Sequence, residues 1–343
     1  MTEHLRRHWF GYLIAFLVLA LPLYASNFFM RSIATRALIL GLVASSLVFL
    51  FKYAGMVSLA QTLLYGVAGF MVGNAVAEGG TRGMQLGWDA WVGMYFALGV
   101  TVVVASIFGA IASRTTGIYF LMLTLTYAVI GFFFFGQVTT FSGFGGISGV
   151  TPPDVLQSSV RVFYVAAIVS ILVYVGFRAI ARTPFGLALQ GIRDDPVRMA
   201  SLGFNVPLHR TMGFVLAGLV AGLAGVLNIW WKGQIDPQSI AIARTIDVLI
   251  IAVIGGISSL EGAWLGAVVF VAANNYLRTI PFIDELGLTE ARFRTVIGIL
   301  VLAIVVLSPE GLTGVIQRAY QWVRRKVAKP MREPLKKEAI DSS

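Results

Sequence analysis

Residues Thr211 to Trp231 read TMGFVLAGLVAGLAGVLNIWW, an apolar run without a charged side chain. A helix needs about 20 apolar residues to cross the hydrocarbon core of a bilayer, so this run predicts a transmembrane helix. The whole chain agrees, because 57% of its 343 residues are apolar and only 12% are charged, against about 25% charged in a typical soluble domain. The sequence therefore predicts an all-α integral membrane protein with short loops and little aqueous domain.

The apolar segments predict about ten transmembrane helices, with a range of about eight to ten because the eighth segment is too short to cross a bilayer alone. The candidate spans, in chain order, are Trp9–Tyr24, Ser32–Phe51, Met56–Ala77, Ala90–Ala112, Gly117–Gly136, Val162–Phe177, Thr211–Trp231, Thr245–Ile254, Ala263–Leu277 and Thr295–Leu307.

The distribution of basic residues predicts the orientation of the chain. With the N-terminus in the cytoplasm, most of the 26 lysine and arginine residues fall on the cytoplasmic side, and the positive-inside rule then places both termini there. The net charge of +10 is thereby assigned to the membrane ends, which argues against a nucleic-acid partner. A cleavable signal is the alternative for the first apolar run, although Leu23 and Ala25 match a small-residue cleavage site poorly.

A polar stretch, RTPFGLALQGIRDDPVRMASLGFNVPLHR at residues 182–210, separates two apolar runs. Thr183 followed by Pro184, and Asp195 followed by Pro196, are typical of helix N-caps with proline in the first helical position. Gly203 suits the left-handed residue after a helix end. The stretch therefore predicts two short capped helices, a rigid feature that a soluble partner can bind. The alternative is a solvated loop with ordinary caps.

Two segments, residues 52–70 and 254–267, combine glycines with polar side chains inside apolar sequence. Such clusters at membrane depth predict broken or re-entrant helices, and paired interruptions often frame a transport path. The alternative is that small residues such as Gly69 and Gly225 only let helices pack closely. The polar residues of the two segments include Ser58, Gln61, Ser258, Ser259 and Glu261.

Ionisable side chains inside apolar runs are costly and need a reason. Arg36 and Asp247 are the clear cases, and they either pair with one another, line an outer vestibule or extend to the membrane interface. Uncharged polar side chains in other spans line a path for a small polar solute or form interhelical hydrogen bonds. The candidate path residues are Ser58, Gln61, Thr124, Tyr127, Asp247, Ser258 and Ser259.

Enzyme chemistry finds little support in the sequence. His4, His8 and His209 have no metal-binding spacing, and in the adjacent pair Asp194 and Asp195 the second residue is explained as a helix cap. The chain also lacks the G-x-x-x-x-G-K-[ST] phosphate-binding loop. The sequence therefore predicts a transport subunit that is not an enzyme and has no metal or cofactor of its own. If ATP drives transport, another polypeptide hydrolyses it.

Several segments resemble, in the correct order, permease subunits of the branched-chain amino acid ABC importers, of the LivM type. They are GMVSLAQTLLYGVAGF (55–70), SRTTGIYFLMLTLTYA (113–128), FSGFGGISGV (141–150), the stretch from TPFGLALQ to GVL (183–227), IGGISSLEGAWLGA (254–267) and SPEGLTGVI (308–316).

The resemblance implies a subunit of the bacterial cytoplasmic (inner) membrane that forms a heterodimer with a second, related permease. It further implies two cytoplasmic ATPase subunits, which hold ATP and Mg²⁺, and an extracytoplasmic substrate-binding protein. Residues 182–210 then form a coupling loop that docks on the ATPase, with polar contacts at its rim, an apolar anchor and a glycine turn. The implied coupling residues are Gly191, Arg193, Asp194, Met199, Leu202 and Gly203.

We expect the chain to divide into a permease domain, residues 1–310, and a basic tail, residues 311–343. Apolar residues at helical spacing between lysines and arginines predict that the tail is an amphipathic helix on the anionic membrane surface, with contact to the ATPase as the alternative. The resemblance implies branched-chain amino acids as the leading substrate. Because Ala60 and Ala263 depart from the family pattern near the expected path, urea, short amides or other solutes are the alternatives.

The competing function class is an ion-coupled secondary transporter of small polar solutes, which also uses broken helices. That class needs a buried carboxylate near the membrane midplane, and Asp247 is the candidate.

Overall fold

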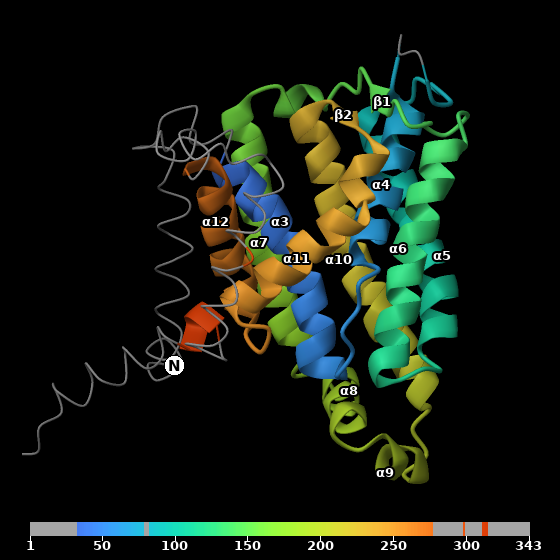
Figure 1. Cartoon of the computed structure of the whole chain (residues 1–343), viewed down its shortest axis with the longest axis vertical. Helices are drawn as coiled ribbons and strands as arrows, with labels where there is room; N and C mark the ends of the chain where they lie inside the picture. Colours follow the sequence, from blue (N-terminus) through green and yellow to red (C-terminus); the bar gives the residue numbers. More distant parts are fainter. Residues whose placement is uncertain (1–32, 79–81, 277–297, 299–310, 315–343) are drawn as a thin grey trace, which may run out of the picture.

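A computed structural model of the chain describes residues 33–78, 82–276, 298 and 311–314. In these residues the regular structure is helical apart from two strands of two residues each, and Figure 1 shows the long helices gathered in one bundle. The elements are α3 (Thr35–Phe49), the π-helix η3 (Leu50–Ala54), α4 (Gln61–Val76), α5 (Ala90–Ala112), α6 (Gly117–Gln137), β1 (Ile147–Ser148), the 3₁₀ turn η4 (Asp154–Leu156), α7 (Ser159–Ile180), α8 (Pro184–Asp194), α9 (Pro196–Ser201), α10 (Val206–Lys232), β2 (Gln234–Ile235), the 3₁₀ turn η5 (Pro237–Ile240), α11 (Ile242–Gly255) and α12 (Leu260–Tyr276).

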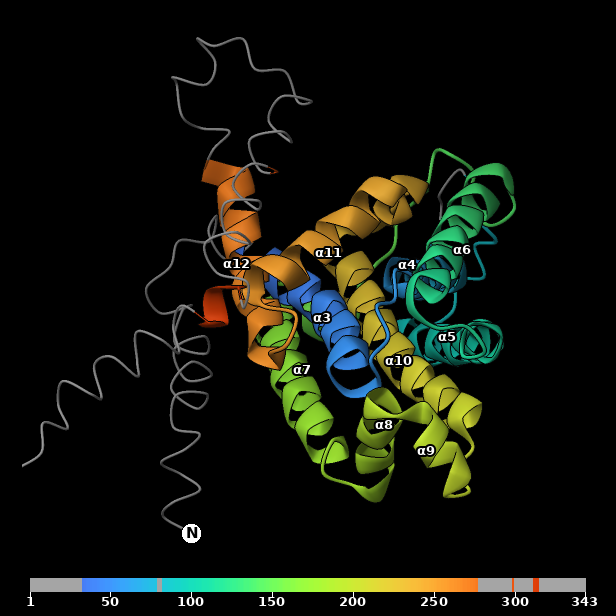
Figure 2. The ribbon, with the colours of Figure 1, turned by 60° about the horizontal axis from the view of Figure 1, so that its bottom comes forward.

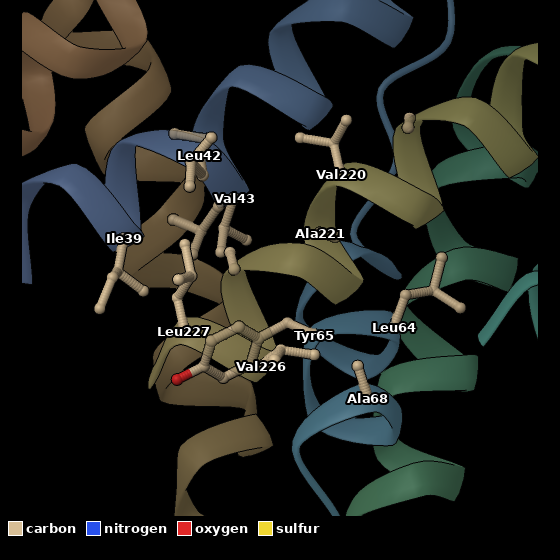
Figure 3. Packing of buried hydrophobic residues seen from close by; sticks show 14 of the residues in the cluster. Ile39, Leu42, Val43, Leu64, Tyr65, Ala68, Val220, Ala221, Val226 and Leu227 are labelled. Atoms are coloured by element: carbon tan, nitrogen blue, oxygen red, sulfur yellow. The ribbon is translucent and has the colours of Figure 1, made fainter. Parts of the chain in front are cut away.

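Helices α3, α4 and α10 form the centre of the bundle. Every residue of α4 is buried, as are most residues of α3. Figure 3 shows apolar side chains of the three helices meeting in one cluster, with Leu42 and Val43 from α3, Tyr65 and Ala68 from α4, and Leu227 from α10. This burial explains why the three helices are apolar on all sides instead of carrying a polar face.

Glycines set the close approach of α4 and α10. A Cβ atom at Gly225 would overlap the carbonyl oxygen of Tyr65 and would lie 3.3 Å from the backbone nitrogen of Gly69. Small residues at such positions let helix backbones come together and gain packing contacts. For this pair the structure confirms the packing role.

Helices α5, α6 and α7 lie at the periphery and expose apolar side chains, among them Ile118 and Tyr119 of α6 and Leu172 of α7. Exposed apolar surface of this extent is typical of contact with lipid. Within the described residues, five helices are long and apolar enough to cross a membrane, or six if the bent pair α11 and α12 forms one span. An all-α membrane fold is therefore confirmed.

The predicted count of about ten spans is not confirmed, because the described residues supply five or six. The segment Trp9–Tyr24, both termini, and the segment Thr295–Leu307 apart from Gly298 lie outside them, as does the tail after residue 314. The predicted span Ala90–Ala112 coincides with α5, and the spans predicted at 117–136, 162–177 and 211–231 match α6, α7 and α10 to within a few residues.

Three predicted spans need correction. Only Gln61–Val76 of the span predicted at 56–77 is helical, because Gly55 adopts a left-handed conformation (φ 68°) that ends η3, and helix resumes only at Gln61. The spans predicted at 245–254 and 263–277 belong to α11 and α12, which are bent by 115° about a short break. The predicted interruptions are therefore present in both segments.

The two ends of the bundle carry different structures (Figures 1 and 2). At one end α8 and α9 project beyond the long helices. At the opposite end β1 pairs with β2, with Ile147 opposite Ile235, and so joins the connection after α6 to the connection after α10. Asn74 of α4 fastens this end further, since its amide donates to the carbonyl of Phe141 and accepts from the backbone N–H of Met84, both at 2.8 Å.

Candidate functional site

The connection between α7 and α10 contains the two short helices that the sequence predicts. Thr183 accepts a hydrogen bond from the backbone N–H of Gly186 at 3.3 Å, and Asp195 accepts one from Arg198 at 2.9 Å. Gly203 has a φ of 89°, the left-handed conformation expected after a helix end. Side-chain caps of this kind satisfy N–H groups that a helix start leaves free. The connection is therefore built structure in which α8 holds α9 away from the bundle.

Helix α9, the turn after it and the first turn of α10 carry exposed apolar side chains, which we define as the apolar tip: Val197, Leu202, Phe204 and Leu208. No residue of α9 is buried, and the exposed fractions of Val197 and Leu202 reach 76% and 65%. Exposed apolar side chains on a projection beyond the long helices are typical of a protein interaction site.

The structure separates the two residues that the sequence predicts as an apolar anchor. Leu202 belongs to the exposed tip, whereas Met199 is half-buried and its sulfur occupies the space beside Gly191 of α8. Met199 therefore joins α9 to α8, and Gly191 makes room for it. The exposure of Val197 and Phe204 was not predicted from the sequence, because a helix of six residues is too short for a periodic pattern to show which side faces out.

Arg193, at the end of α8, contacts both its neighbour in the chain and the helix η3. Its guanidinium contacts the carboxylate oxygen of the adjacent Asp194 through Nε and Nη2, each at 2.8 Å. Its Nη1 donates to the carbonyl of Lys52 in η3, and its Cγ would lie 2.7 Å from a Cβ at Gly55. The predicted coupling residue Arg193 therefore reaches back to the long helices.

The segment between η3 and α4, residues 55–60, is not helical and is fixed by buried hydrogen bonds. The Ser46 hydroxyl donates to the Gln61 amide oxygen at 3.1 Å, and the Gln61 amide nitrogen donates to the Ser58 hydroxyl at 3.3 Å. The backbone N–H of Leu59 donates to the Thr124 hydroxyl of α6 at 3.1 Å. Three predicted path residues, Ser58, Gln61 and Thr124, thus surround one segment of freed backbone.

The start of α4 meets the start of α11 inside the bundle. The Thr62 and Thr245 hydroxyls are 2.6 Å apart, and both side chains are buried. Figure 1 shows the chain reaching α4 from the end that carries α8 and α9, and reaching α11 from the end that carries β1 and β2. Helix α4 follows a non-helical segment and α11 follows the short 3₁₀ turn η5. The two helices thus begin against each other after segments that enter from opposite ends, an arrangement typical of transporter sites.

The second glycine-rich break, between α11 and α12, is a packed corner. Backbone atoms of Gly255 and Gly262 approach so closely that neither position has room for a Cβ. Thr313 donates to the carbonyl of Gly255 at 3.0 Å and lies 2.8 Å from the Ser259 hydroxyl, which supplies partners for the freed backbone. Ser258 is exposed. The bond between Thr62 and Thr245 joins the start of α4 to the start of α11, the helix that precedes this second break.

A charged cluster joins α7 to the second break. Glu261 accepts hydrogen bonds from Arg178 at 2.8 Å and from the Tyr174 hydroxyl at 2.6 Å. The Arg178 and Glu261 side chains are each about one-third exposed, so the pair stabilises the fold by no more than about 1 kcal/mol. Glu261 stands out in the sequence, but its partners do not, because they lie more than eighty residues away along the chain.

Two further predicted path residues, Asp247 and Tyr127, have partners other than the pair Thr62 and Thr245. Asp247 forms an ion pair with Arg244, one turn earlier on α11, at 3.2 Å. The ring of Tyr127 stacks on Phe108 of α5 with 4.4 Å between centroids, and its hydroxyl lies 3.4 Å from the Phe108 carbonyl oxygen. Tyr127 thus fastens α6 to α5, and Asp247 stabilises the first part of α11.

Comparison with known proteins gives a family match and several relatives. Residues 29–305 match the family model described as "Branched-chain amino acid transport system / permease component". The chain is similar to the high-affinity branched-chain amino acid transport system permease protein LivM of Salmonella typhimurium, with 29% identity over 143 residues, which cover 42% of this chain and 33% of LivM. The LivM protein of Escherichia coli gives the same identity and coverage.

A third relative is the probable branched-chain amino acid transport permease protein LivH of Methanocaldococcus jannaschii, with 25% identity over 156 residues, which cover 45% of this chain and 49% of LivH. The chain thus spans between a third and a half of the length of these relatives. No solved structure matches the chain.

Proposed function

The chain belongs to the family of branched-chain amino acid transport system permease components, and from this premise we propose that it is the membrane-spanning permease subunit of an ATP-driven importer. Its substrates are branched-chain amino acids or related small polar solutes. The chain forms part of the translocation path and takes its energy from separate ATPase subunits through residues 182–210.

The observation that carries this proposal is the apolar tip on α9. A connection between two membrane helices has no structural need for a second capped helix that buries none of its residues. An exposed apolar tip on a rigid support suits docking into a groove of a soluble protein. Because the chain has no phosphate-binding loop of its own, an ATPase is the partner that best fits the tip.

The translocation path passes the place where α4 and α11 begin. Helix starts present free N–H groups and a partial positive charge, which favour the carboxylate of an amino acid. Ser58, Gln61 and Thr124 line the approach from the α8 and α9 end, and Thr62 and Thr245 close it by their mutual hydrogen bond. Ser258, Ser259, Asp247 and Tyr127 contribute at its edges.

The assembly contains a second related permease, two ATPase subunits that bind ATP and Mg²⁺, and an extracytoplasmic substrate-binding protein. Similarity to relatives named LivM and LivH supports two permeases of one family. The end with α8 and α9 faces the cytoplasm of a bacterial inner membrane, and the end with β1 and β2 receives the binding protein.

The test is reconstitution of the chain in liposomes with the ATPase and permease subunits that co-purify with it, with the binding protein added outside. Uptake of radiolabelled leucine, isoleucine or valine is expected to require ATP inside the liposomes and the binding protein outside them. Solute uptake by the chain alone, driven by a proton or sodium gradient, would overturn the proposal and establish a secondary transporter.

A further inference from the structure

The carbonyl of Lys52 receives its hydrogen bond from another part of the chain. Lys52 lies in the last turn of η3, where a helix has no N–H groups left to pair with its own carbonyls. The N–H groups of Gly55 and Met56 turn back to the carbonyls of Phe51 and Leu50 at 3.1 Å each. The Nη1 atom of Arg193 supplies a donor to the Lys52 carbonyl. An arginine of α8 thus caps the helix that precedes the non-helical segment.

Gly55 and Arg193 are fitted to one another. Gly55 has a φ of 68°, a conformation that glycine adopts without strain. A Cβ at this position would also lie 2.7 Å from the Arg193 Cγ and would displace the arginine stem. The position therefore needs glycine for its backbone angle and for the arginine that lies across it.

The cap stands at one end of a continuous series of contacts. From Gly55 the chain runs directly into the segment held by Ser58, Gln61 and Thr124, and then into the first turn of α4, where Thr62 meets Thr245. In the other direction along the chain, Arg193 contacts Asp194, and the next residue, Asp195, caps α9. A displacement of α9 therefore reaches the start of α4 through one side chain and a segment without helical structure of its own.

We infer that Arg193 is the positioning residue that transmits movement of the α8 and α9 connection to residues 55–60, by holding or releasing the Lys52 carbonyl. The inference rests on the proposed function, because it needs an ATPase that moves α9. It assigns Arg193 a role inside the permease, beyond a polar contact at the rim of the ATPase. Without the cap, the ATPase still binds α9, but its movement no longer reaches residues 55–60.

The experiment exploits the absence of cysteine from the chain, which makes one introduced thiol the only one in the subunit. Val57→Cys places a probe at a half-buried position in the middle of the non-helical segment. The rate of its reaction with a charged maleimide is measured in inside-out vesicles of the native membrane, with and without ATP and vanadate. Co-purification of the ATPase is measured in parallel.

The comparison uses three variants in the Val57→Cys background. Arg193→Met keeps the apolar stem over Gly55 and removes every donor, whereas Arg193→Lys keeps the charge and one flexible donor. Arg114→Met is the matched control, since Arg114 is an exposed arginine between α5 and α6 at the same end of the bundle.

Nucleotide is expected to change the labelling rate severalfold in the parent and in Arg114→Met, less in Arg193→Lys, and not at all in Arg193→Met, while the ATPase co-purifies with all four. An unchanged nucleotide response in Arg193→Met overturns the inference, and so does a parent protein whose segment never responds although its ATPase is bound. If no ATPase co-purifies with the wild-type chain, the proposed function itself fails and the inference falls with it.

Discussion

Thr62 and Thr245 share a hydrogen bond of 2.6 Å between side chains that are both buried, and this bond joins the first turn of α4 to the first turn of α11. The two residues are 183 positions apart in the chain. Helix α4 begins after the non-helical residues 55–60 and α11 begins after the 3₁₀ turn η5, so the bond lies where both α-helices start. A polar bond at this place connects the stability of the bundle to the path proposed for the solute.

Replacing one threonine is expected to cost more stability than replacing both. Thr62→Val or Thr245→Val leaves the other hydroxyl buried without its partner, at a cost of about 1–3 kcal/mol. The double variant Thr62→Val, Thr245→Val removes both hydroxyls and is expected to unfold near the wild-type temperature, because valine has the shape of threonine. The unfolding temperatures of the single and double variants, measured in detergent, test this expectation.

Uptake separates the two roles of this pair. If the threonines form part of the path, the double variant regains stability but transports poorly. Uptake that recovers in parallel with stability would show that the pair only joins two helices.

The sequence predicted the α8 and α9 connection well because its signals are local. The caps at Thr183 and Asp195 and the left-handed Gly203 each depend on residues within one helical turn, and such short-range rules can be read without knowledge of the fold. The outward side of the connection was predicted only in part, since Leu202 is exposed while Met199 packs on α8.

The junction of α4 and α11 was not predicted for a physical reason. Threonine in an apolar run reads the same whether its hydroxyl bonds to its own helix, as in Thr101 with the carbonyl of Ala97, or to a distant one, as in Thr62. Pairing of the glycine-rich breaks was inferred from their similar composition. Composition reports that helical structure is interrupted, but the partner of each interruption depends on tertiary packing.

Gly225 and Gly99 are expected to respond in opposite ways to alanine. Gly225→Ala places a methyl group against the Tyr65 carbonyl between two central helices, so the protein is expected to lose stability severely or fail to accumulate. Gly99 of α5 has no atom within 4 Å of the corresponding position, and Gly99→Ala is expected to be neutral or to stabilise by up to about 1 kcal/mol. Expression level and thermal unfolding in detergent test both. Equal behaviour of the two variants would contradict the helix packing described here.

Removing the cap of α9 is expected to loosen that helix alone. Asp195→Ala removes the bond to the Arg198 N–H, a change that costs about 1 kcal/mol, and a helix of six residues without buried side chains has little else to hold it. Trypsin is expected to cut after Arg198 faster in this variant, with the unfolding temperature of the bundle unchanged. In Thr183→Ala, by contrast, the buried Leu189 and Ile192 still hold α8, so digestion should stay close to wild type.

The apolar tip and Met199 are expected to fail in different ways when each receives a charge. Val197→Asp and Leu202→Asp place carboxylates on side chains that are already exposed, so the unfolding temperature should hold while ATPase co-purification and ATP-dependent uptake fall about tenfold or more, as for an apolar contact worth over about 1.4 kcal/mol. Met199→Asp instead buries a charge against Gly191 and should expose α9 to trypsin before it weakens docking. The opposite result would be a Leu202→Asp protein that keeps its ATPase and a folded Met199→Asp protein that loses it. That result would mean that α9 binds the partner through the side that carries Met199.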